Sequence, residues 1–266
     1  MTSELSNSGF NAISNFFHQH SGIRLKPSKR VLVTSRLASE SARLHCASLD
    51  EYVKRIIATP QSPEALRVID LLTTNETYFF REAAHFQHLE QILRKSPGMP
   101  PMRIWSAAAS SGEEAYSIGM TLGRHGGQRG CEVIGTDLST RMVAHARQGL
   151  YLEERCSQIS PPDLKRWCLR GEGTYSGQVL MNKELRSKVK FEVGNLLHPM
   201  TELGQFDVIF LRNVLIYFEG DAKSQLLTNV ISHLKPGAYL YTGHAESLRG
   251  TTHDLKQVAP AIYQRS

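Results

Sequence analysis

The spacing of apolar positions divides the chain into two parts. Residues 1 to about 90 carry apolar side chains at helical intervals, which predicts an all-α region. From Arg103 onward, short runs of β-branched and aromatic residues alternate with helical stretches. Such alternation is typical of right-handed βαβ units on a largely parallel sheet. The sequence therefore predicts α/β architecture, with a small N-terminal all-α domain before a doubly wound, Rossmann-like domain.

The second part has a regular order of elements with one interruption. The expected strands are residues 103–108, 131–137, 188–195, 206–213, 237–244 and 261–265, and the expected helices begin near Gly112, Ser139 and Asp221. Residues 154–185 interrupt this order with a short helix pattern and a glycine-rich, hairpin-like piece, which predicts an inserted antiparallel β-subdomain at about 168–190. The turn-rich stretch KSPGMPP predicts a connection, so the domains are expected at 1–90 and 91–266.

The stretch LLTTNETYFFRE, from Leu71 to Glu82, lies well before the first expected strand. Thr73 and Glu76 have the spacing of a capping box, which predicts the start of a helix there. On that helix Thr77 and Arg81 would share a face. The simple interpretation is that its aromatic residues enter a core.

The stretch RLKPSKRVLVTSRLASESAR, residues 24–43, is strongly basic and contains the single acid Glu40. Ser28 is expected to cap a helix that runs through Leu44. Lys29, Arg36 and Arg43 recur every two helical turns and so form one stripe. This stripe is either a solvated face or a docking surface for an acidic partner.

Composition narrows the possible classes of protein. With 41% hydrophobic and 21% charged residues, the chain is typical of a soluble globular protein, and its apolar runs are too short for membrane insertion. We therefore expect a cytoplasmic protein. The four cysteines form no C-x-x-C pair, so neither a disulfide framework nor a metal site is expected. The net charge of +6 is compatible with a nucleic acid or with an acidic protein as partner.

Polar residues at the ends of the expected strands are the candidates for ligand binding, because ligands of open α/β sheets lie there. Asp137 closes the second strand, where a carboxylate accepts from ribose hydroxyls or caps the next helix. The first loop, SAAASSGEEAYS, lacks the G-x-G-x-x-G pattern of dinucleotide binders. Glu113 and Glu114 repel phosphate and favour a cation or an amine. S-adenosylmethionine, with its adenosine, amino group and sulfonium, fits this loop.

Five blocks in this order carry a resemblance to a known family: TTNETYFFRE, WSAAASSGEEAYSIGM, GTDLSTRMVAHARQGLY, FDVIFLRNVLIYF and LKPGAYLYTGHAESL. Together they resemble the CheR family, the chemotaxis receptor protein-glutamate O-methyltransferases. The resemblance covers nearly the whole chain. It implies an enzyme that transfers a methyl group from S-adenosyl-L-methionine to glutamate carboxylates of chemoreceptors, forming methyl esters and S-adenosyl-L-homocysteine for sensory adaptation.

The resemblance also implies the site residues. Glu114 would take the methionine amino group, Asp137 the ribose, and Tyr217 would stand near the transferred methyl group. The remaining residues of the cofactor wall would be Asn75, Thr77, Arg81, Asn195, Leu196, Arg212 and Asn213. A glutamate side chain is already ionised near neutral pH, so catalysis is mainly positioning, with Tyr217 and Arg81 orienting the reactants.

The implied partner is the cytoplasmic helical region of chemoreceptors, which is rich in acidic residues. The stripe of Lys29, Arg36 and Arg43 would dock on it. In the family the inserted β-piece can also grip a short receptor tail, which here would place tail binding around Arg170 to Lys190. Nothing in the sequence points to an obligate oligomer, so a monomer is expected.

Two rival functions remain open at this stage. A nucleic-acid methyltransferase fits the positive charge, but FLRNVLIYF replaces the Pro-Pro-aromatic motif of adenine enzymes and no nucleophilic cysteine is evident. No nucleic-acid partner is therefore expected. A non-catalytic module that binds the receptor or the cofactor is the second rival, and a methyl-transfer assay separates it from an enzyme.

Overall fold

The computed structural model describes residues 4–95, 100–125, 131–248 and 254–266. The chain folds into two compact units. The first contains the segment up to Thr74 together with Tyr217–Ala222, and the second contains Asn75–Ile216 and Lys223–Ser266. Most of the predicted connection KSPGMPP lies outside the described residues. The predicted domain division at residues 90 and 91 stays a prediction, although residues 75–90 group here with the sheet.

The first unit is built from helices, as the sequence predicts. They are α1 (Asn7–Ser21), the 3₁₀ helix η1 (Pro27–Lys29), α2 (Arg30–Arg43), α3 (Leu49–Ala58) and α4 (Pro63–Leu72). Serine side chains cap α1, α3 and α4, since each hydroxyl accepts a hydrogen bond from a backbone N–H in the first turn. The apolar faces form a common core, with Ile13, Phe17, Leu37, Ile56 and Val68 fully buried.

The predicted cap of α2 is wrong. Ser28 lies inside η1, and α2 begins at Arg30 with no side-chain cap. Pro27 explains the shift, because a proline favours the first position of a helical turn and starts the short 3₁₀ helix there. The end of the helix agrees with the prediction, since Leu44 is its C-cap residue.

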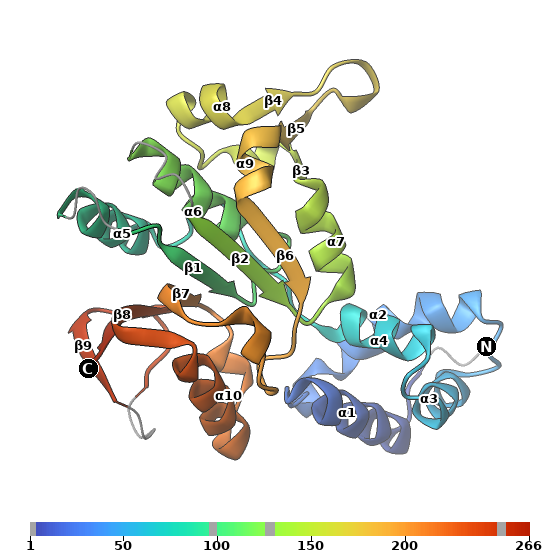
Figure 1. Cartoon of the computed structure of the whole chain (residues 1–266). Coiled ribbons are helices and arrows are strands. Elements are labelled where there is room, and N and C mark those ends of the chain that lie inside the picture. Colours follow the sequence, from blue (N-terminus) through green and yellow to red (C-terminus); the bar gives the residue numbers. More distant parts are fainter. Residues whose placement is uncertain (1–3, 96–99, 126–130, 249–253) are drawn as a thin grey trace. The chain divides into compact units, whose positions relative to one another are not determined.

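The second unit contains a seven-stranded sheet in the order β6-β2-β1-β7-β8-β10-β9 (Figure 1). Its strands are β1 (Arg103–Ala107), β2 (Glu132–Asp137), β6 (Val189–Val193), β7 (Phe206–Leu211), β8 (Leu234–Thr242), β9 (Leu255–Ala259) and β10 (Ile262–Arg265). The strands from β6 to β8 pair in parallel, while β10 and β9 are antiparallel. The predicted doubly wound sheet is confirmed, but the edge strand β9 was not predicted.

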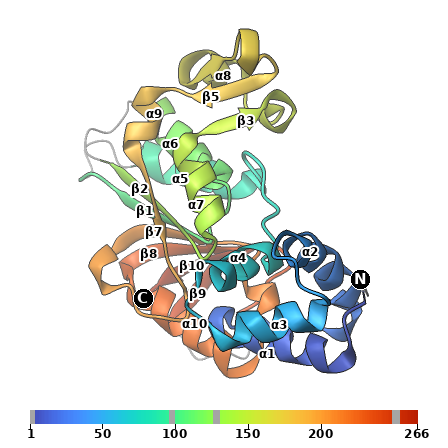
Figure 2. The same cartoon turned by 90° about the vertical axis from the view of Figure 1, so that its right-hand side faces the viewer.

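Helices cover both faces of this sheet. They are α5 (Ala83–Lys95), α6 (Glu113–Arg124), α7 (Thr140–Gln148) and α10 (Gly220–Ser232). Two short 3₁₀ helices flank β7, with η4 (Thr201–Leu203) before it and η5 (Leu215–Tyr217) after it. Figures 1 and 2 show α6 and α7 on the opposite face from α10. The right-handed crossover rule accounts for this arrangement, since the strand order reverses direction beside β1.

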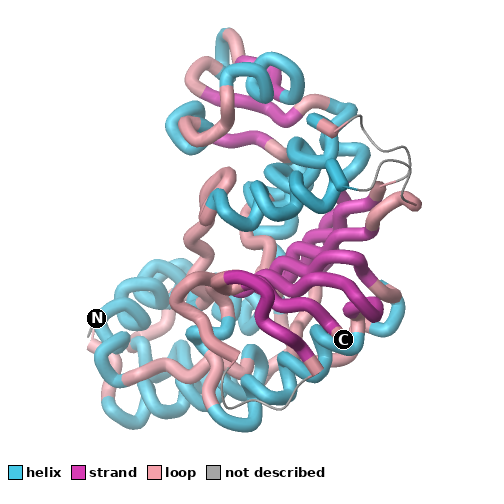
Figure 3. Tube along the Cα trace, turned by 90° about the vertical axis from the view of Figure 1, so that its left-hand side faces the viewer, coloured by secondary structure: helices cyan, strands magenta, loops and turns pink. Residues whose placement is uncertain are grey.

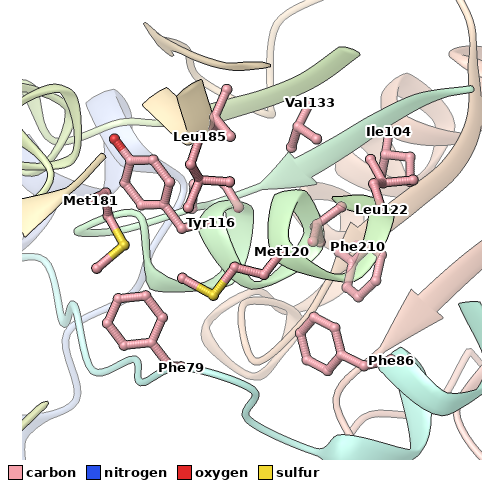
Figure 4. Close-up of a cluster of buried hydrophobic side chains, with 14 of the residues drawn as sticks. Phe79, Phe86, Ile104, Tyr116, Met120, Leu122, Val133, Met181, Leu185 and Phe210 are labelled. Carbon is pink, nitrogen blue, oxygen red and sulfur yellow. The ribbon is translucent and has the colours of Figure 1, made fainter. Parts of the chain in front are cut away.

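A continuous apolar core fixes the sheet and the helices of its α6 face. Figure 4 shows side chains from α5, α6, β1, β2 and β7 converging, among them Phe86, Met120, Ile104 and Phe210. Phe79, from the segment before α5, is also fully buried in this cluster. Each such side chain stabilises the fold by about 1.5–3 kcal/mol when it is removed from water. The core therefore ties the segment before α5 to the sheet.

A separate three-stranded antiparallel sheet, β3-β5-β4, confirms the predicted insertion (Figure 3). The inserted region holds β3 (Leu150–Leu152), η2 (Glu153–Cys156), α8 (Pro161–Trp167), β4 (Cys168–Arg170), η3 (Gly173–Tyr175), β5 (Gln178–Met181) and α9 (Lys183–Lys188). The predicted bounds of 168–190 were too narrow at the start, because β3 supplies one edge. They were too wide at the end, where residues 189 and 190 belong to β6 of the large sheet.

The predicted helix start at Thr73 is wrong. Thr73 instead ends α4, since its N–H donates to the Ile69 carbonyl and its hydroxyl donates to the Asp70 carbonyl over 2.8 Å. Residues 73–82 form no helix, and α5 begins only at Ala83. Phe80 and Glu82 have φ values of 54° and 56°, a left-handed conformation that a right-handed helix excludes.

Within the described residues, no helix is both long enough and apolar enough to cross a membrane.

Candidate active site

Polar side chains gather at the carboxyl edge of the large sheet. Glu114, in the first turn of α6, has both carboxylate oxygens engaged. The Ser106 hydroxyl donates to one oxygen over 2.7 Å, and Nη1 of Arg212 donates to the other over 2.9 Å. Burial raises the pKa of the Glu114 carboxyl, and the positive charge of Arg212 opposes that rise. Glu114 and Arg212 are therefore brought together as a buried ion pair.

Arg212 follows β7 and links this pair to a second carboxylate. Its side chain is 1% exposed, and Nη2 lies 3.3 Å from Oε2 of Glu82. The same nitrogen donates to the Arg81 carbonyl. Burial raises the pKa of Glu82, but Arg212 and Asn213 outweigh that effect and hold the pKa below its usual range. Arg212 thus stands between two acids, and its buried Nε has no hydrogen-bond partner among the described residues.

Asp137 ends β2 and holds the loop that follows β1. Its Oδ2 accepts from the Ser110 N–H and its Oδ1 from the Ser139 N–H, both over 2.8 Å. Ser139 is the residue that caps α7, since its hydroxyl accepts from the Met142 N–H. The helix-capping role is therefore carried by Ser139, and Asp137 orients the two turns that meet at the sheet edge.

The loop itself needs a glycine at one position. Gly112 has a φ of 98°, and a Cβ there would lie 2.8 Å from Cβ of Ala146 and 3.0 Å from the Phe191 ring. This backbone conformation is strained for any other residue. The turn lets α6 begin directly beneath the loop, which brings Glu113 and Glu114 to the sheet edge.

Hydrogen bonds of its own backbone groups hold the segment before α5 in place. The carbonyl of Asn75 accepts from the Ser110 hydroxyl over 2.9 Å, and the Thr77 carbonyl accepts from Arg155 over 2.8 Å. The Phe80 N–H donates to the Ser117 hydroxyl over 3.0 Å. We call Asn75 to Glu82 the cofactor segment.

The other predicted wall residues lie at the ends of β6 and β7. Asn195 is half-buried, and its side chain accepts from the Leu197 N–H over 3.0 Å. Leu196 is buried, and its carbonyl accepts from Asn229 over 3.0 Å. Asn213 has a φ of 58°, and its N–H donates to Glu246 over 2.9 Å. All three positions are thus fixed by hydrogen bonds, which for Leu196 and Asn213 come from residues 33 positions further along the chain.

The four remaining predicted residues group with the helical unit. Tyr217, at the end of η5, belongs to it through the segment Tyr217–Ala222. Lys29 is exposed on η1. Arg36 is half-buried, and its Nη1 donates to the carbonyls of Leu71 and Thr73 over 2.9 Å. Arg43 pairs with Glu40 over 2.8 Å. Within the stripe, Arg36 and Arg43 therefore have structural partners.

Glu82, His85 and His244 form the one group with ligand atoms placed for a metal ion in the described part of the chain. Oε2 of Glu82 lies 3.5 Å from Nδ1 of His85 and 3.2 Å from Nδ1 of His244. Arg212 contacts the same oxygen, so its positive charge opposes a cation there. The expectation of no metal stays a prediction.

Sequence reasoning missed Arg155 and Glu82, which organise the site. Arg155 lies in the inserted region, and its Nε donates to the fully buried Glu113 over 3.0 Å. Glu82 contacts Arg212, Asn213 and His244. For Glu82 a signal existed, since it closes the block TTNETYFFRE. For Arg155 the one available signal was Glu113, an acid at a predicted helix start. Such an acid requires a basic partner if it is buried.

The chain was compared with known protein families and proteins. The family described as "CheR methyltransferase, all-alpha domain" matches residues 8–73, and "CheR methyltransferase, SAM binding domain" matches residues 75–263. A chemotaxis protein methyltransferase of Klebsiella aerogenes is 37% identical over 262 residues, covering 97% of this chain and 90% of the relative. One of Escherichia coli is 38% identical over 248 residues, with 91% and 85% covered. Chemotaxis protein methyltransferase 2 of Pseudomonas aeruginosa is 36% identical over 258 residues, with 96% and 91% covered.

Proposed function

The chain belongs to the CheR methyltransferase family, and from this premise we propose how its residues carry the family's reaction. Its function is the transfer of a methyl group from S-adenosylmethionine to glutamate carboxylates of chemoreceptors. It is thus an S-adenosylmethionine-dependent protein-glutamate O-methyltransferase of chemotaxis. The observation that carries this conclusion is the match of the S-adenosylmethionine-binding domain over residues 75–263, the stretch that holds the polar cluster at the sheet edge.

The residues at the sheet edge fit S-adenosylmethionine. When bound, this cofactor supplies an activated methyl group on a sulfonium. Asp137 is a buried carboxylate at the end of β2, where it suits ribose hydroxyls. Ser106 and Arg212 orient the Glu114 carboxylate, and we assign the ammonium group of the cofactor to it. Asn75, Thr77 and Arg81 wall the site from the cofactor segment, and Asn195, Leu196, Arg212 and Asn213 wall it from the strand ends.

The chain contributes to the reaction by positioning the two reactants and by excluding water from them. The glutamate nucleophile of the receptor is ionised near neutral pH, so no general base is needed. Tyr217 orients this carboxylate through its hydroxyl, and Arg81 orients the cofactor carboxylate or the substrate. Alignment of the reacting groups supplies most of the acceleration, up to about 7–11 kcal/mol in the best intramolecular cases. S-adenosylhomocysteine is the product.

Partner binding is assigned to two surfaces. Lys29, Arg36 and Arg43 form the receptor-docking stripe, in which Lys29 and Arg43 are exposed and Arg36 is half-buried. The small antiparallel sheet binds the receptor tail. Its apolar side chains Leu152 and Leu169, 52% and 55% exposed, support that assignment. The protein acts as a monomer in the cytoplasm, where the helical region of chemoreceptors lies.

The identity of the molecule that accepts the methyl group distinguishes this function from the two rival functions. The protein is incubated with methyl-labelled S-adenosylmethionine and, in separate reactions, with a receptor cytoplasmic fragment, duplex DNA and RNA. Label is expected on the receptor fragment alone. Label on nucleic acid would favour the nucleic-acid enzyme, and cofactor binding without any transfer would favour the non-catalytic module.

A further inference from the structure

Arg155 joins three parts of the second unit. Its Nε donates to Oε1 of Glu113 over 3.0 Å, and its Nη2 donates to the same oxygen and to the Thr77 carbonyl, the latter over 2.8 Å. Glu113 begins α6, and Thr77 belongs to the cofactor segment. Arg155 itself lies in η2, directly after the first strand of the small sheet.

The second carboxylate oxygen of Glu113 is also held by a hydrogen bond. Glu113 is fully buried, and its Oε2 accepts from the Ser111 hydroxyl over 2.6 Å. A buried carboxylate without a partner costs several kcal/mol, so Glu113 holds Arg155 firmly in place. A further N–H of the guanidinium, on Nη2, is thereby aimed at one backbone atom, the Thr77 carbonyl.

The small sheet gives η2 its own support. The Glu153 N–H donates to the Gly177 carbonyl over 2.9 Å, beside β5. Tyr151, in β3, is buried, donates to the Ser111 carbonyl over 2.7 Å and packs edge-on against Phe79 at 5.1 Å between ring centroids. Tyr151 and Arg155 thus connect the small sheet with the first loop and with the cofactor segment.

From this geometry we propose that Arg155 is a positioning residue for cofactor binding: anchored on Glu113, it fixes the Thr77 carbonyl and so sets the place of the Asn75, Thr77 and Arg81 side chains. The inference rests on the proposed roles of these three residues. It also assigns the small sheet a second role beside partner binding: the sheet holds the cofactor segment in position through Tyr151 and Arg155.

The test uses the full chain with two double variants. Arg155→Met with Glu113→Gln removes the clamp without leaving a buried charge unpaired, which protects the fold. Arg103→Met with Glu132→Gln is a matched control, because Arg103 likewise bridges a glutamate, over 2.9 Å, and a backbone carbonyl, that of Gln205, over 3.0 Å. That pair lies where β1 and β2 begin, at the opposite edge of the sheet.

The readouts are the KM for S-adenosylmethionine, the Kd for S-adenosylhomocysteine, kcat and the unfolding midpoint. We expect the Arg155 variant to raise KM and Kd by about tenfold, as for the loss of one charge-assisted hydrogen bond, with kcat changed less than about twofold. The single variant Arg155→Lys, which keeps the charge, is expected to recover part of this affinity.

Three outcomes separate the claims. If the Arg155 variant binds like the wild type, or if both double variants lose affinity equally, Arg155 is not a positioning residue. If the Arg155 variant alone loses affinity while its unfolding midpoint matches that of the control, the proposal stands. If the wild type itself neither binds the cofactor nor transfers a methyl group, it is the proposed function that fails.

Discussion

At the scale of single residues, His85 has the most unusual environment. It is fully buried, lies 5.2 Å between ring centroids from both Tyr241 and His244, and has no hydrogen-bond partner for either ring nitrogen among the described residues. Burial, aided by the nearby charge of Arg212, lowers the pKa of His85 to about 3. The folded protein therefore keeps this ring neutral.

This neutral ring makes the fold sensitive to acid. Below its ordinary pKa near 6.5, His85 takes up a proton in the unfolded chain but not in the folded one. Stability is thus lost as the pH falls from about 6.5 toward 3, by about 1.7 kcal/mol between pH 6.5 and pH 5. We expect His85→Phe to reduce this loss, as measured by urea unfolding at several pH values. The exposed His198→Phe serves as control, and an unchanged pH slope for His85→Phe would refute the assignment.

Tyr217 is the residue whose proposed role is chemical. Tyr217→Phe removes only the hydroxyl that is proposed to orient the receptor carboxylate. Turnover is therefore expected to fall about tenfold, while the affinity for the cofactor stays the same. Calorimetry of S-adenosylhomocysteine binding beside a methyl-transfer assay measures both. Equal turnover in variant and wild type would limit Tyr217 to shaping the pocket.

At the scale of elements, η1 and α2 divide their basic residues between two tasks. Arg36 donates to the last carbonyls of α4 and so closes that helix. Arg36→Met is expected to lower the free energy of unfolding by about 1–3 kcal/mol, because these carbonyls lose their charged partner. Lys29→Glu is expected to leave unfolding unchanged and to reduce receptor methylation and its salt sensitivity.

A matched charge reversal separates docking from net charge. Lys54 is exposed on α3, so Lys54→Glu changes the charge equally without touching the stripe. Urea unfolding, receptor methylation at two salt concentrations and cofactor binding are compared for all three variants. If Lys29→Glu and Lys54→Glu lose methylation equally, the stripe is no docking surface.

The cofactor segment shows why part of the site escaped prediction from sequence. Thr73 and Glu76 have the spacing of a helix start, yet residues 73–82 form no helix. Their backbone groups find partners far away along the chain, such as Ser117 for Phe80 and Arg155 for Thr77. A local pattern cannot reveal such partners, whereas a nearly continuous apolar run such as FDVIFL indicates a buried strand by itself and was predicted correctly.

At the scale of the whole molecule, the alternation of strands and helices was enough to predict the parallel sheet. Helical periodicity predicted the N-terminal part, and the break in the alternation predicted the insertion. The polar residues at strand ends followed from that topology, and Glu114, Asp137 and Arg212 do lie at the carboxyl edge. Two features depended on tertiary contacts and were missed. The edge strand β9 pairs with β10 alone among the strands of the described residues, and the small sheet begins at β3 because β5 pairs with it.

This chain forms methyl esters on receptor glutamates. The most direct measurement combines mass spectrometry of a methylated receptor fragment with mild alkaline hydrolysis, which cleaves esters but not N-methyl groups. We expect a methyl group on a glutamate peptide that disappears in alkali and is absent when that glutamate is replaced by alanine. A methyl group that survives alkali, or one located on another residue type, would contradict it.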